Sequence, residues 1–404
     1  MSEWKETDFG KIPSDWDLKK IIELKANDKR AIAMGPFGSN IKAENFVESG
    51  VPVIRGTNLN FDKYVGGQFV YLTEDKANEL IGSNCYPGDL VFTHRGTIGQ
   101  VGLIPDNKFR RYVISQSGMK LTVNPDLMDN EFLFYFFKSE HGQYQILKYE
   151  SQVGVPSISN PLTSLKEIEV PVPSFKEQRA IASVLSSLDD KIDLLHRQNA
   201  TLEKMAETLF RQWFVEEAKE DWQEGTLGEV IEIFDSMRIP LSRMERDKKK
   251  DGQLYPYYGA AQIMDYINDY IFEGEYILLG EDGTVRTSEG YPVLQYATGK
   301  FWVNNHTHVI QAKSPYNNFF VWNYLRKMSI DEIITGAVQP KINQGNLRSL
   351  PFPKFPRKLV IEFNDLSESF FKKINQNKTQ IRTLTALRDT LLPKLMSGEV
   401  RVEM

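Results

Sequence analysis

Residues 181–202 read IASVLSSLDDKIDLLHRQNATL, and their apolar side chains recur in alternating steps of three and four. Neither Pro nor Gly interrupts the chain from Phe175 to Glu217. An alternation held over about four heptads is typical of a coiled-coil seam. The stretch therefore predicts one long helix with a single apolar seam. The predicted seam positions are Leu185, Leu188, Ile192, Leu195, Asn199 and Leu202.

A second segment of the same kind extends from Arg357 to Leu395. Two successive four-residue steps, from Leu366 to Ile374, indicate a local break in its alternation. Each helix is about 60 Å long at 1.5 Å per residue, and a lone helix of that length is stable only when its apolar face is covered. We therefore expect the two seams to cover each other, with the helices antiparallel because a globular module separates them. The second predicted seam contains Phe363, Leu366, Phe370, Ile374, Asn377, Ile381, Leu384, Leu391 and Leu395.

Each predicted seam contains one asparagine near its midpoint, Asn199 in the first helix and Asn377 in the second. A buried asparagine on a seam fixes the register of two helices at a cost in stability. We predict that the two side chains meet near a pseudo-twofold axis. The alternative is that each asparagine faces solvent at an irregular turn.

The rest of the chain repeats itself in two modules, each of which leads into one of the long helices. Several echoes occur in the same order, and this order predicts an internal duplication. The paired segments are Asp15-Trp16 with Asp221-Trp222, residues 88–97 with 274–284, residues 155–159 with 339–343, and Pro171-Val172-Pro173 with Pro351-Phe352-Pro353.

Short apolar runs bounded by Gly, Asn and Pro turns predict strands in both modules, at Val51–Ile54, Asp89–Phe92 and Tyr276–Leu279. Aromatic runs at 132–137 and 319–325 predict helices whose rings belong to the core and are not platforms for stacked bases. The expected fold is therefore mixed α/β (α+β) with internal duplication. Two globular domains would be separated by two long antiparallel coiled-coil helices in a pseudo-twofold arrangement.

Composition limits the classes of function. The 404 residues include one cysteine, Cys85, which excludes an internal disulfide framework and fits a reducing, cytoplasmic location. The sequence has no apolar run of about 18 residues, so neither a transmembrane helix nor a membrane partner is expected. A net charge of −5 argues mildly against nucleic acid. Local basic groups at Arg110-Arg111 and Arg243–Lys250 are compatible with DNA, although a lone charge cluster of this kind is better explained as a solvated loop.

Three stretches within or beside the two predicted long helices resemble one protein family. Residues 384–402 read LTALRDTLLPKLMSGEVRV, residues 171–185 read PVPSFKEQRAIASVL, and residues 209–214 read LFRQWF. These stretches are similar to the specificity subunits of type I restriction-modification systems. The resemblance extends over the whole chain, and it is loose inside the modules, where such a family would vary with the DNA that it reads.

The resemblance implies two target-recognition domains, at 1–172 and 219–356, each reading one half of a split, asymmetric site in double-stranded DNA. Spacer helices at 173–218 and 357–404, the latter including a C-terminal tail, would set the gap between the half-sites. Two modification (methyltransferase) subunits would dock on this chain, and restriction (motor-nuclease) subunits would complete a phage-defence enzyme. S-adenosylmethionine, ATP and Mg²⁺ are expected in those partners, and no cofactor is expected in this chain.

The sequence lacks the motifs of a catalytic subunit. An adenine methyltransferase would show Asn/Asp-Pro-Pro-aromatic, and the nearest string, Asn124-Pro125-Asp126, lacks the second proline. Gly299-Lys300 has no phosphate-cradle context. His306 and His308 alternate along one predicted strand, but no third histidine, cysteine or clear carboxylate lies nearby, which favours a polar strand over a metal site. We expect a non-catalytic chain without a metal.

Base readout requires polar or basic side chains on exposed loops that reach groove edges. For any single residue, a turn side chain that satisfies local backbone is the alternative, but the recurrence of such residues in both modules favours DNA. The candidates in the first module are Arg55, Asn58, Thr93, His94, Arg95, Thr97 and Gln116. Those in the second are Asp282, Thr284, Arg286, Thr287, Asn305, His306, Thr307, Gln339 and Lys341.

Two other classes of function remain open from the residues alone. A scaffold that binds peptides or glycans fits the acidic net charge, and the helical resemblance argues against it. A stand-alone enzyme is remote because the sequence shows no nucleophile, metal or phosphate constellation.

Overall fold

A computed structural model describes residues 4–8, 10–38, 40–59, 63–106, 108–151, 154–218, 222–336 and 339–402. The chain divides into two compact units. Unit 1 ends at Leu195 and resumes at Gln380, and unit 2 comprises His196–Thr379. Both long helices contribute to both units. None of the described helices is long and apolar enough to cross a membrane.

Unit 1 contains two four-stranded sheets, in the orders β4-β11-β8-β9 and β6-β5-β10-β7. The first is formed by β4 (Ile32–Met34), β11 (Gly118–Leu121), β8 (Leu90–Thr93) and β9 (Val101–Leu103). The second is formed by β6 (Val70–Leu72), β5 (Val51–Ile54), β10 (Tyr112–Ile114) and β7 (Asn84–Cys85). The short elements around them are β1 (Trp4–Thr7), β2 (Gly10–Pro13), β3 (Asp17–Lys20), α1 (Ile21–Leu24), α2 (Glu74–Glu79), α4 (Glu140–Leu147), β12 (Glu150–Ser151), β13 (Ser157–Ile158), α5 (Pro161–Glu167) and β14 (Glu169–Val172).

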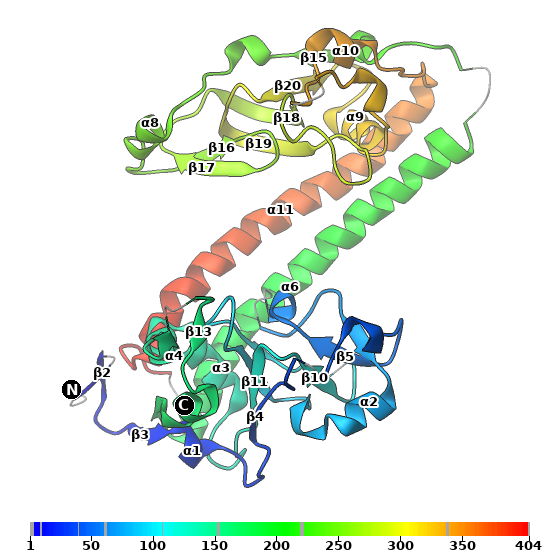
Figure 1. Cartoon of the computed structure of the whole chain (residues 1–404). Helices are drawn as coiled ribbons and strands as arrows, with labels where there is room; N and C mark the ends of the chain where they lie inside the picture. The colour runs from blue at the N-terminus through cyan, green and yellow to red at the C-terminus, as the bar shows by residue number, and fades with distance from the viewer. Residues whose placement is uncertain are drawn as a thin grey trace. The chain divides into compact units, whose positions relative to one another are not determined.

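Unit 2 contains one six-stranded sheet in the order β15-β20-β18-β19-β16-β17 (Figure 1). Its strands are β15 (Ile231–Ile233), β20 (Thr307–Ala312), β18 (Phe272–Gly280), β19 (Leu294–Val303), β16 (Tyr255–Tyr258) and β17 (Ile263–Ile267). Its short helices are α7 (Leu227–Val230), α8 (Arg243–Asp247) and α10 (Gln344–Ser349).

The strand pairings confirm the predicted duplication. The order β4-β11-β8-β9 in unit 1 is matched by β15-β20-β18-β19 in unit 2. Strand β5 pairs in parallel with β10 and antiparallel with β6, just as β16 pairs in parallel with β19 and antiparallel with β17. The long β19 thus takes the place of both β9 and β10, which merges the two sheets of unit 1 into the single sheet of unit 2.

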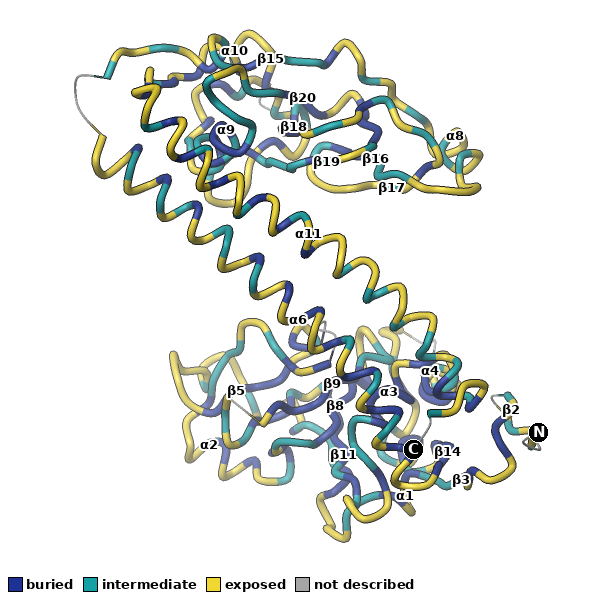
Figure 2. Tube along the Cα trace, turned by 180° about the vertical axis from the view of Figure 1, so that it is seen from behind, coloured by how far each residue is buried: buried dark blue, intermediate teal, exposed yellow. Residues whose placement is uncertain are grey.

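One buried aromatic helix accompanies the sheets of each unit. In α3 (Asn130–Lys138) every residue from Phe132 to Phe137 is buried, and in α9 (Asn318–Leu325) Phe319, Phe320 and Leu325 are buried (Figure 2). Asp129 caps α3 by accepting a hydrogen bond from the Phe132 amide, and Asn317 caps α9 in the same way. The prediction that these rings form core is confirmed.

The two predicted long helices are present as α6 (Phe175–Arg211), which continues into a π-helical turn at Gln212–Glu216, and α11 (Arg357–Met396). Within each unit they run side by side and antiparallel (Figure 1). Among the predicted seam residues, the buried ones are Leu185, Ile192, Leu195, Asn199, Phe363, Ile374, Asn377 and Leu395. The partly buried ones are Leu188, Leu202, Phe370, Ile381, Leu384 and Leu391. The two asparagines meet, with Asn377 Nδ2 donating to Asn199 Oδ1 over 2.9 Å.

The seam departs from the prediction beside the second module, near the beginning of α11 and the end of α6. Leu366 is 44% exposed, and Ser367 and Phe371 are buried instead. Phe371 packs against Tyr296 and Phe319 of the second module, with ring centroids 4.4 and 5.5 Å apart. An α-helix drifts relative to a strict heptad, so this end of α11 turns its apolar face toward the module.

The same drift occurs at the end of α6. Ala206, Phe210 and Phe214 are buried there, whereas Leu209 and Trp213, which would continue the spacing of the seam, are only partly buried. The Phe210 ring lies 5.2 Å from that of Phe320. The ends of both long helices are therefore part of the module core as well as of the seam.

The C-terminal motif packs against the first residues of unit 1. The Arg401 guanidinium donates to Asp15 Oδ2 over 3.0 Å and to Glu177 Oε2 over 2.9 Å, and the Trp16 indole N–H donates to Glu177 over 3.2 Å. Gly398 has a φ of +74°, and a side chain there would collide with Pro13. Residues 398–401 thus connect the segment 13–16 to the start of α6 within unit 1.

Candidate nucleic-acid interface

The echoed segments form one loop in each module, built on the same backbone hydrogen bonds. The first repeated loop comprises residues 93–97 and 156–158, and the second comprises 280–284 and 340–342. The amide of Gly96 donates to the Pro156 carbonyl over 2.9 Å, and Gly283 donates to Pro340 over 3.1 Å. Both glycines have a positive φ, +87° and +72°, a conformation that favours glycine.

Two further backbone bonds recur in the same places. Ile158 N–H donates to the His94 carbonyl, and Ile342 N–H donates to the Glu281 carbonyl, each over 2.8 Å. The His94 amide donates to the Ser117 carbonyl over 2.9 Å. In the second module, the Glu281 amide donates to the His306 carbonyl over the same distance. The two modules therefore hold equivalent loops that carry different side chains: Arg95 corresponds to Asp282, and Ser157 to Lys341.

The first repeated loop borders a polar hollow of about 350 Å³, which we call the Arg95 hollow. Arg95 and Thr97 are exposed on the loop, and Arg55 is exposed on the turn after β5. Gln116 is exposed, whereas Thr93 is buried and donates to the Thr97 carbonyl. The hollow is lined by Arg55, Gly56, Thr57, Thr93, Arg95, Thr97, Gln100 and Ser117.

Three predicted base readers, Asn58, His94 and Thr307, have buried side chains. Asn58 is 1% exposed; its Oδ1 accepts from the Arg55 amide over 3.0 Å, and its Nδ2 donates to two carbonyls of the next turn. His94 is buried with Nε2 3.1 Å from the Gln116 carbonyl oxygen, and its burial lowers its pKa. Thr307 is 0% exposed in β20. Buried side chains do not reach a base edge, so these three residues are not base readers. The sequence could not show this, because residue type and loop position do not reveal burial.

In the second module several candidates are paired with one another or with carboxylates. His306 Nδ1 lies 2.6 Å from Asp282 Oδ1, and Arg286 forms an ion pair with Asp331 over 2.7 Å. Lys341, which is half exposed, lies 3.2 Å from Glu281. Thr287 Oγ1 accepts from the Tyr291 amide. Thr284, Asn305 and Gln339 are exposed.

The two local basic groups are largely neutralised. Arg111 pairs with Glu74. In the group around α8, Arg246 lies 3.0 Å from Asp265 and Lys249 lies 2.7 Å from Asp269. Most of the positive charge of these groups is therefore paired with carboxylates at the surface of the protein.

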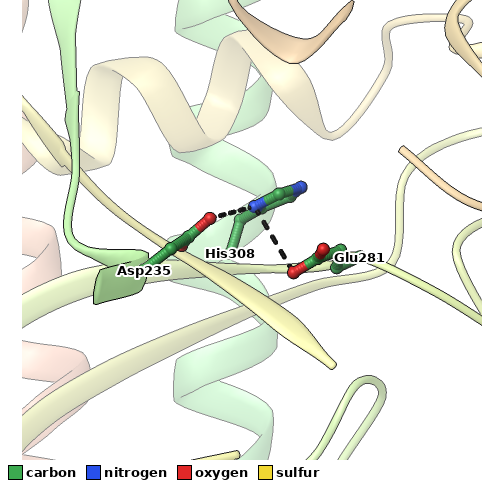
Figure 3. A group of neighbouring side chains, drawn as sticks. All are labelled: Asp235, Glu281 and His308. Atoms are coloured by element: carbon green, nitrogen blue, oxygen red, sulfur yellow. Dashed lines mark hydrogen bonds and ion pairs between the residues drawn. The ribbon is translucent and has the colours of Figure 1, made fainter. Parts of the chain in front are cut away.

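Asp235 and His308, both buried, form a polar cluster with Glu281 of the second repeated loop (Figure 3). His308 is 0% exposed, with Nδ1 2.6 Å from Asp235 Oδ2 and Nε2 2.8 Å from the Ile342 carbonyl oxygen. The Asp235 carboxylate and the Ile342 carbonyl thus lie within hydrogen-bond distance of the two ring nitrogens. His308 thereby ties the loop to the turn after β15.

The expectation that no carboxylate lies near His308 is wrong. Ligand-type atoms of Asp235, Glu281 and His308 lie within 4.8 Å of one another. Asp235 is 73 residues upstream of His308, so no local spacing could reveal the group. Arg238 supplies a cation there, 2.6 Å from Glu281 and 3.6 Å from Asp235. The carboxylates are already neutralised by the chain's own cations, which favours a structural cluster over a metal site.

The charge state of Asp235 follows from its surroundings. Burial alone would raise the pKa of Asp235, but the hydrogen bond and charge of His308, together with the Val309 amide, outweigh burial and lower the pKa. Val309 N–H donates to Asp235 Oδ1 over 2.9 Å, and Gln344 Nε2 donates to Oδ2 over 2.6 Å. The carboxylate is therefore ionised and saturated with donors.

Comparisons with known proteins agree with the duplicated fold. The type I restriction modification DNA specificity domain matches residues 15–204 and 219–356. The chain is 26% identical over 447 residues to the type I restriction enzyme MjaIX specificity subunit of Methanocaldococcus jannaschii, which covers 100% of this chain and 97% of that protein. It is 35% identical over 153 residues to a putative type I restriction enzyme specificity subunit of Haemophilus influenzae, covering 38% of each.

A solved structure shows the same fold. The crystal structure of the S subunit of a type I restriction-modification system from M. genitalium has a TM-score of 0.63 to this chain, at 20% identity and 96% coverage of both. The family match includes both modules and most of the first long helix. The chain therefore belongs to the family of type I restriction-modification DNA specificity subunits.

Proposed function

We propose that the two modules each read one half of a split, asymmetric site in double-stranded DNA. The observation that carries this proposal is the pair of repeated loops, which share their backbone hydrogen bonds and differ in their side chains. An equivalent scaffold presents each loop to DNA in the same manner, while Arg95 in one module and Asp282 in the other select different bases.

The long helices act as the spacer in this proposal. They set the gap between half-sites, with the modules in a pseudo-twofold relation, and they dock two modification subunits. The boundaries that we propose are 1–172 and 219–356 for the target-recognition domains and 173–218 and 357–404 for the spacer and tail. The paired asparagines at 199 and 377 support this role, because a polar pair on a seam fixes register.

The chain itself is non-catalytic in this account and acts in the cytoplasm. Its modification subunits bind S-adenosylmethionine and flip the target adenine, and restriction subunits use ATP and Mg²⁺. The acidic net charge is compatible with DNA binding because the first module exposes two arginines at one hollow. Phosphate contacts across the whole complex supply the remaining affinity.

The experiment is to express this chain with the modification subunit of its own system and map methylated adenines by sequencing the DNA. We expect one split, asymmetric motif that appears only when both chains are present. A motif produced by the modification subunit alone, or no methylation by the purified complex, would contradict the proposal. In that case the scaffold interpretation would be favoured.

A further inference from the structure

The Arg95 hollow has positive charges that the fold leaves unpaired. Arg55 and Arg95 both line it, and neither guanidinium has a hydrogen-bond or ion-pair partner among the described residues. No carboxylate is among its lining residues, and Thr57, Thr97 and Ser117 contribute hydroxyl groups. A concave surface with unpaired donors suits a ligand that presents acceptors.

The second repeated loop shows the opposite balance. The position of Arg95 is taken by Asp282 there, and the neighbouring cations all have carboxylate partners. Arg238 and Lys341 lie 2.6 and 3.2 Å from Glu281, and Arg286 lies 2.7 Å from Asp331. The unpaired charge in the first module is therefore a feature of that module and not of the scaffold.

The difference between Arg95 and Asp282 helps to decide whether Arg95 contacts a phosphate or a base edge of the DNA. Phosphates are the same in every half-site, so equivalent loops would hold them with similar residues. Base edges differ between half-sites, and a position that reads them should differ between modules. The exchange of Arg95 for Asp282 reverses the charge at one place on the shared scaffold, which favours a base edge for Arg95.

We propose that Arg95 reads a guanine in the half-site of the first module, by donating to N7 and O6 in the major groove. A guanidinium matches this acceptor pair in bidentate fashion, and it is the commonest specific contact of arginine with DNA. The inference rests on the proposed function and makes it more specific. It assigns the first half-site a guanine whose recognition requires a fork of two donors and not only a positive charge.

The test uses the full chain in complex with its modification subunit, acting on a DNA library randomised across both half-sites. Methylated molecules are sequenced for the wild type and for Arg95→Ala, Arg95→Lys and Arg30→Ala. Arg30 is an exposed arginine of the same unit that precedes β4, at the end of the sheet opposite to Thr93. Thermal melting of each complex verifies that the variants are folded.

We expect Arg95→Ala to lose the preference for guanine at one position of one half-site, by about 5-fold to 150-fold. Arg95→Lys loses much of the same preference because a lysine lacks the planar fork. Arg30→Ala keeps the wild-type motif. The second half-site is unchanged in every variant.

Two results would overturn the assignment while leaving the proposed function intact. One is an Arg95→Ala complex that methylates all sites more weakly, with an unchanged motif and a shallower salt dependence, which indicates a phosphate contact. The other is full rescue by Arg95→Lys. A wild-type complex that directs no methylation would instead contradict the proposed function itself.

Discussion

Asn377 donates from Nδ2 to Oδ1 of Asn199 over 2.9 Å, with both residues buried on the seam of the two long helices. Asn377 Oδ1 is buried without a hydrogen-bond partner among the described residues. An unsatisfied buried oxygen reduces stability, so this pair specifies the alignment of the helices at the expense of their stability.

The first prediction concerns this pair. Replacing both residues, in Asn199→Leu with Asn377→Leu, should raise the free energy of unfolding by about 1–2 kcal/mol, because the apolar seam is completed. Urea denaturation followed by circular dichroism measures the change. The control adds leucines beside the pair on the exposed side, in Ala200→Leu with Lys378→Leu, and should be nearly neutral. A loss of stability on completing the seam would contradict this account.

The second prediction concerns His308, which joins Asp235 to the Ile342 carbonyl. Substitution His308→Ala leaves a buried carboxylate without its main partner and should lower the free energy of unfolding by about 3–5 kcal/mol. The nearby His306→Ala changes an exposed side chain and should lower it by less than about 1 kcal/mol. Equal effects of the two variants in thermal denaturation would show that the buried cluster does not anchor the loop.

The third prediction is a pH dependence. The pKa of Asp235 is lowered in the folded state, so its contribution to stability is fully present above its unfolded pKa of about 3.9 and is lost as the pH falls through the lower, folded pKa. We therefore expect the free energy of unfolding to decrease with acidification below about pH 4. The decrease should be smaller in Asp235→Asn. An identical slope in the wild type and in this variant would rule out Asp235 as a source of the acid sensitivity.

The fourth prediction concerns the polar contact between the first module and both long helices. Asp189 of α6 accepts from the Tyr135 hydroxyl of α3 over 2.7 Å and from Arg388 of α11 over 2.8 Å. Because Asp189 is buried, Arg388→Ala should lower the free energy of unfolding by about 2–4 kcal/mol. Arg382→Ala, on the exposed surface of the same helix, is the matched control. Chemical denaturation of the two variants should separate them clearly, and no difference would contradict the role of Arg388.

The helices and the duplication could be predicted from the sequence because they depend on local periodicity and on order along the chain. Leu185 and Ile192 are buried as their spacing predicts, and Asn199 meets Asn377 because both lie at the midpoints of their segments. Ser367 and Phe371 are buried in place of Leu366 because this part of α11 contacts the second module. The spacing of apolar residues along the helix carries no information about that contact.

The candidate site could be predicted only in part. The loops were recognisable because Gly96 and Gly283 recur in matching contexts, and the structure places them in the same backbone hydrogen bonds. Asn58 has the same residue type and loop setting as a base reader, yet its amide is used by a turn. The cluster of Asp235 with His308 joins residues far apart in the sequence, and only the folded sheet brings them together.

The most direct test of the central claim is one methylation map of variants in each repeated loop. Arg95→Ala changes the first loop, and Asp282→Ala with Lys341→Ala changes the second, each in the full chain with its modification subunit. We expect the first variant to alter one half of the motif and the second variant to alter only the other half, with the gap between them unchanged. Changes confined to the same half, or an unaltered motif in both variants, would contradict the claim that each module reads its own half-site.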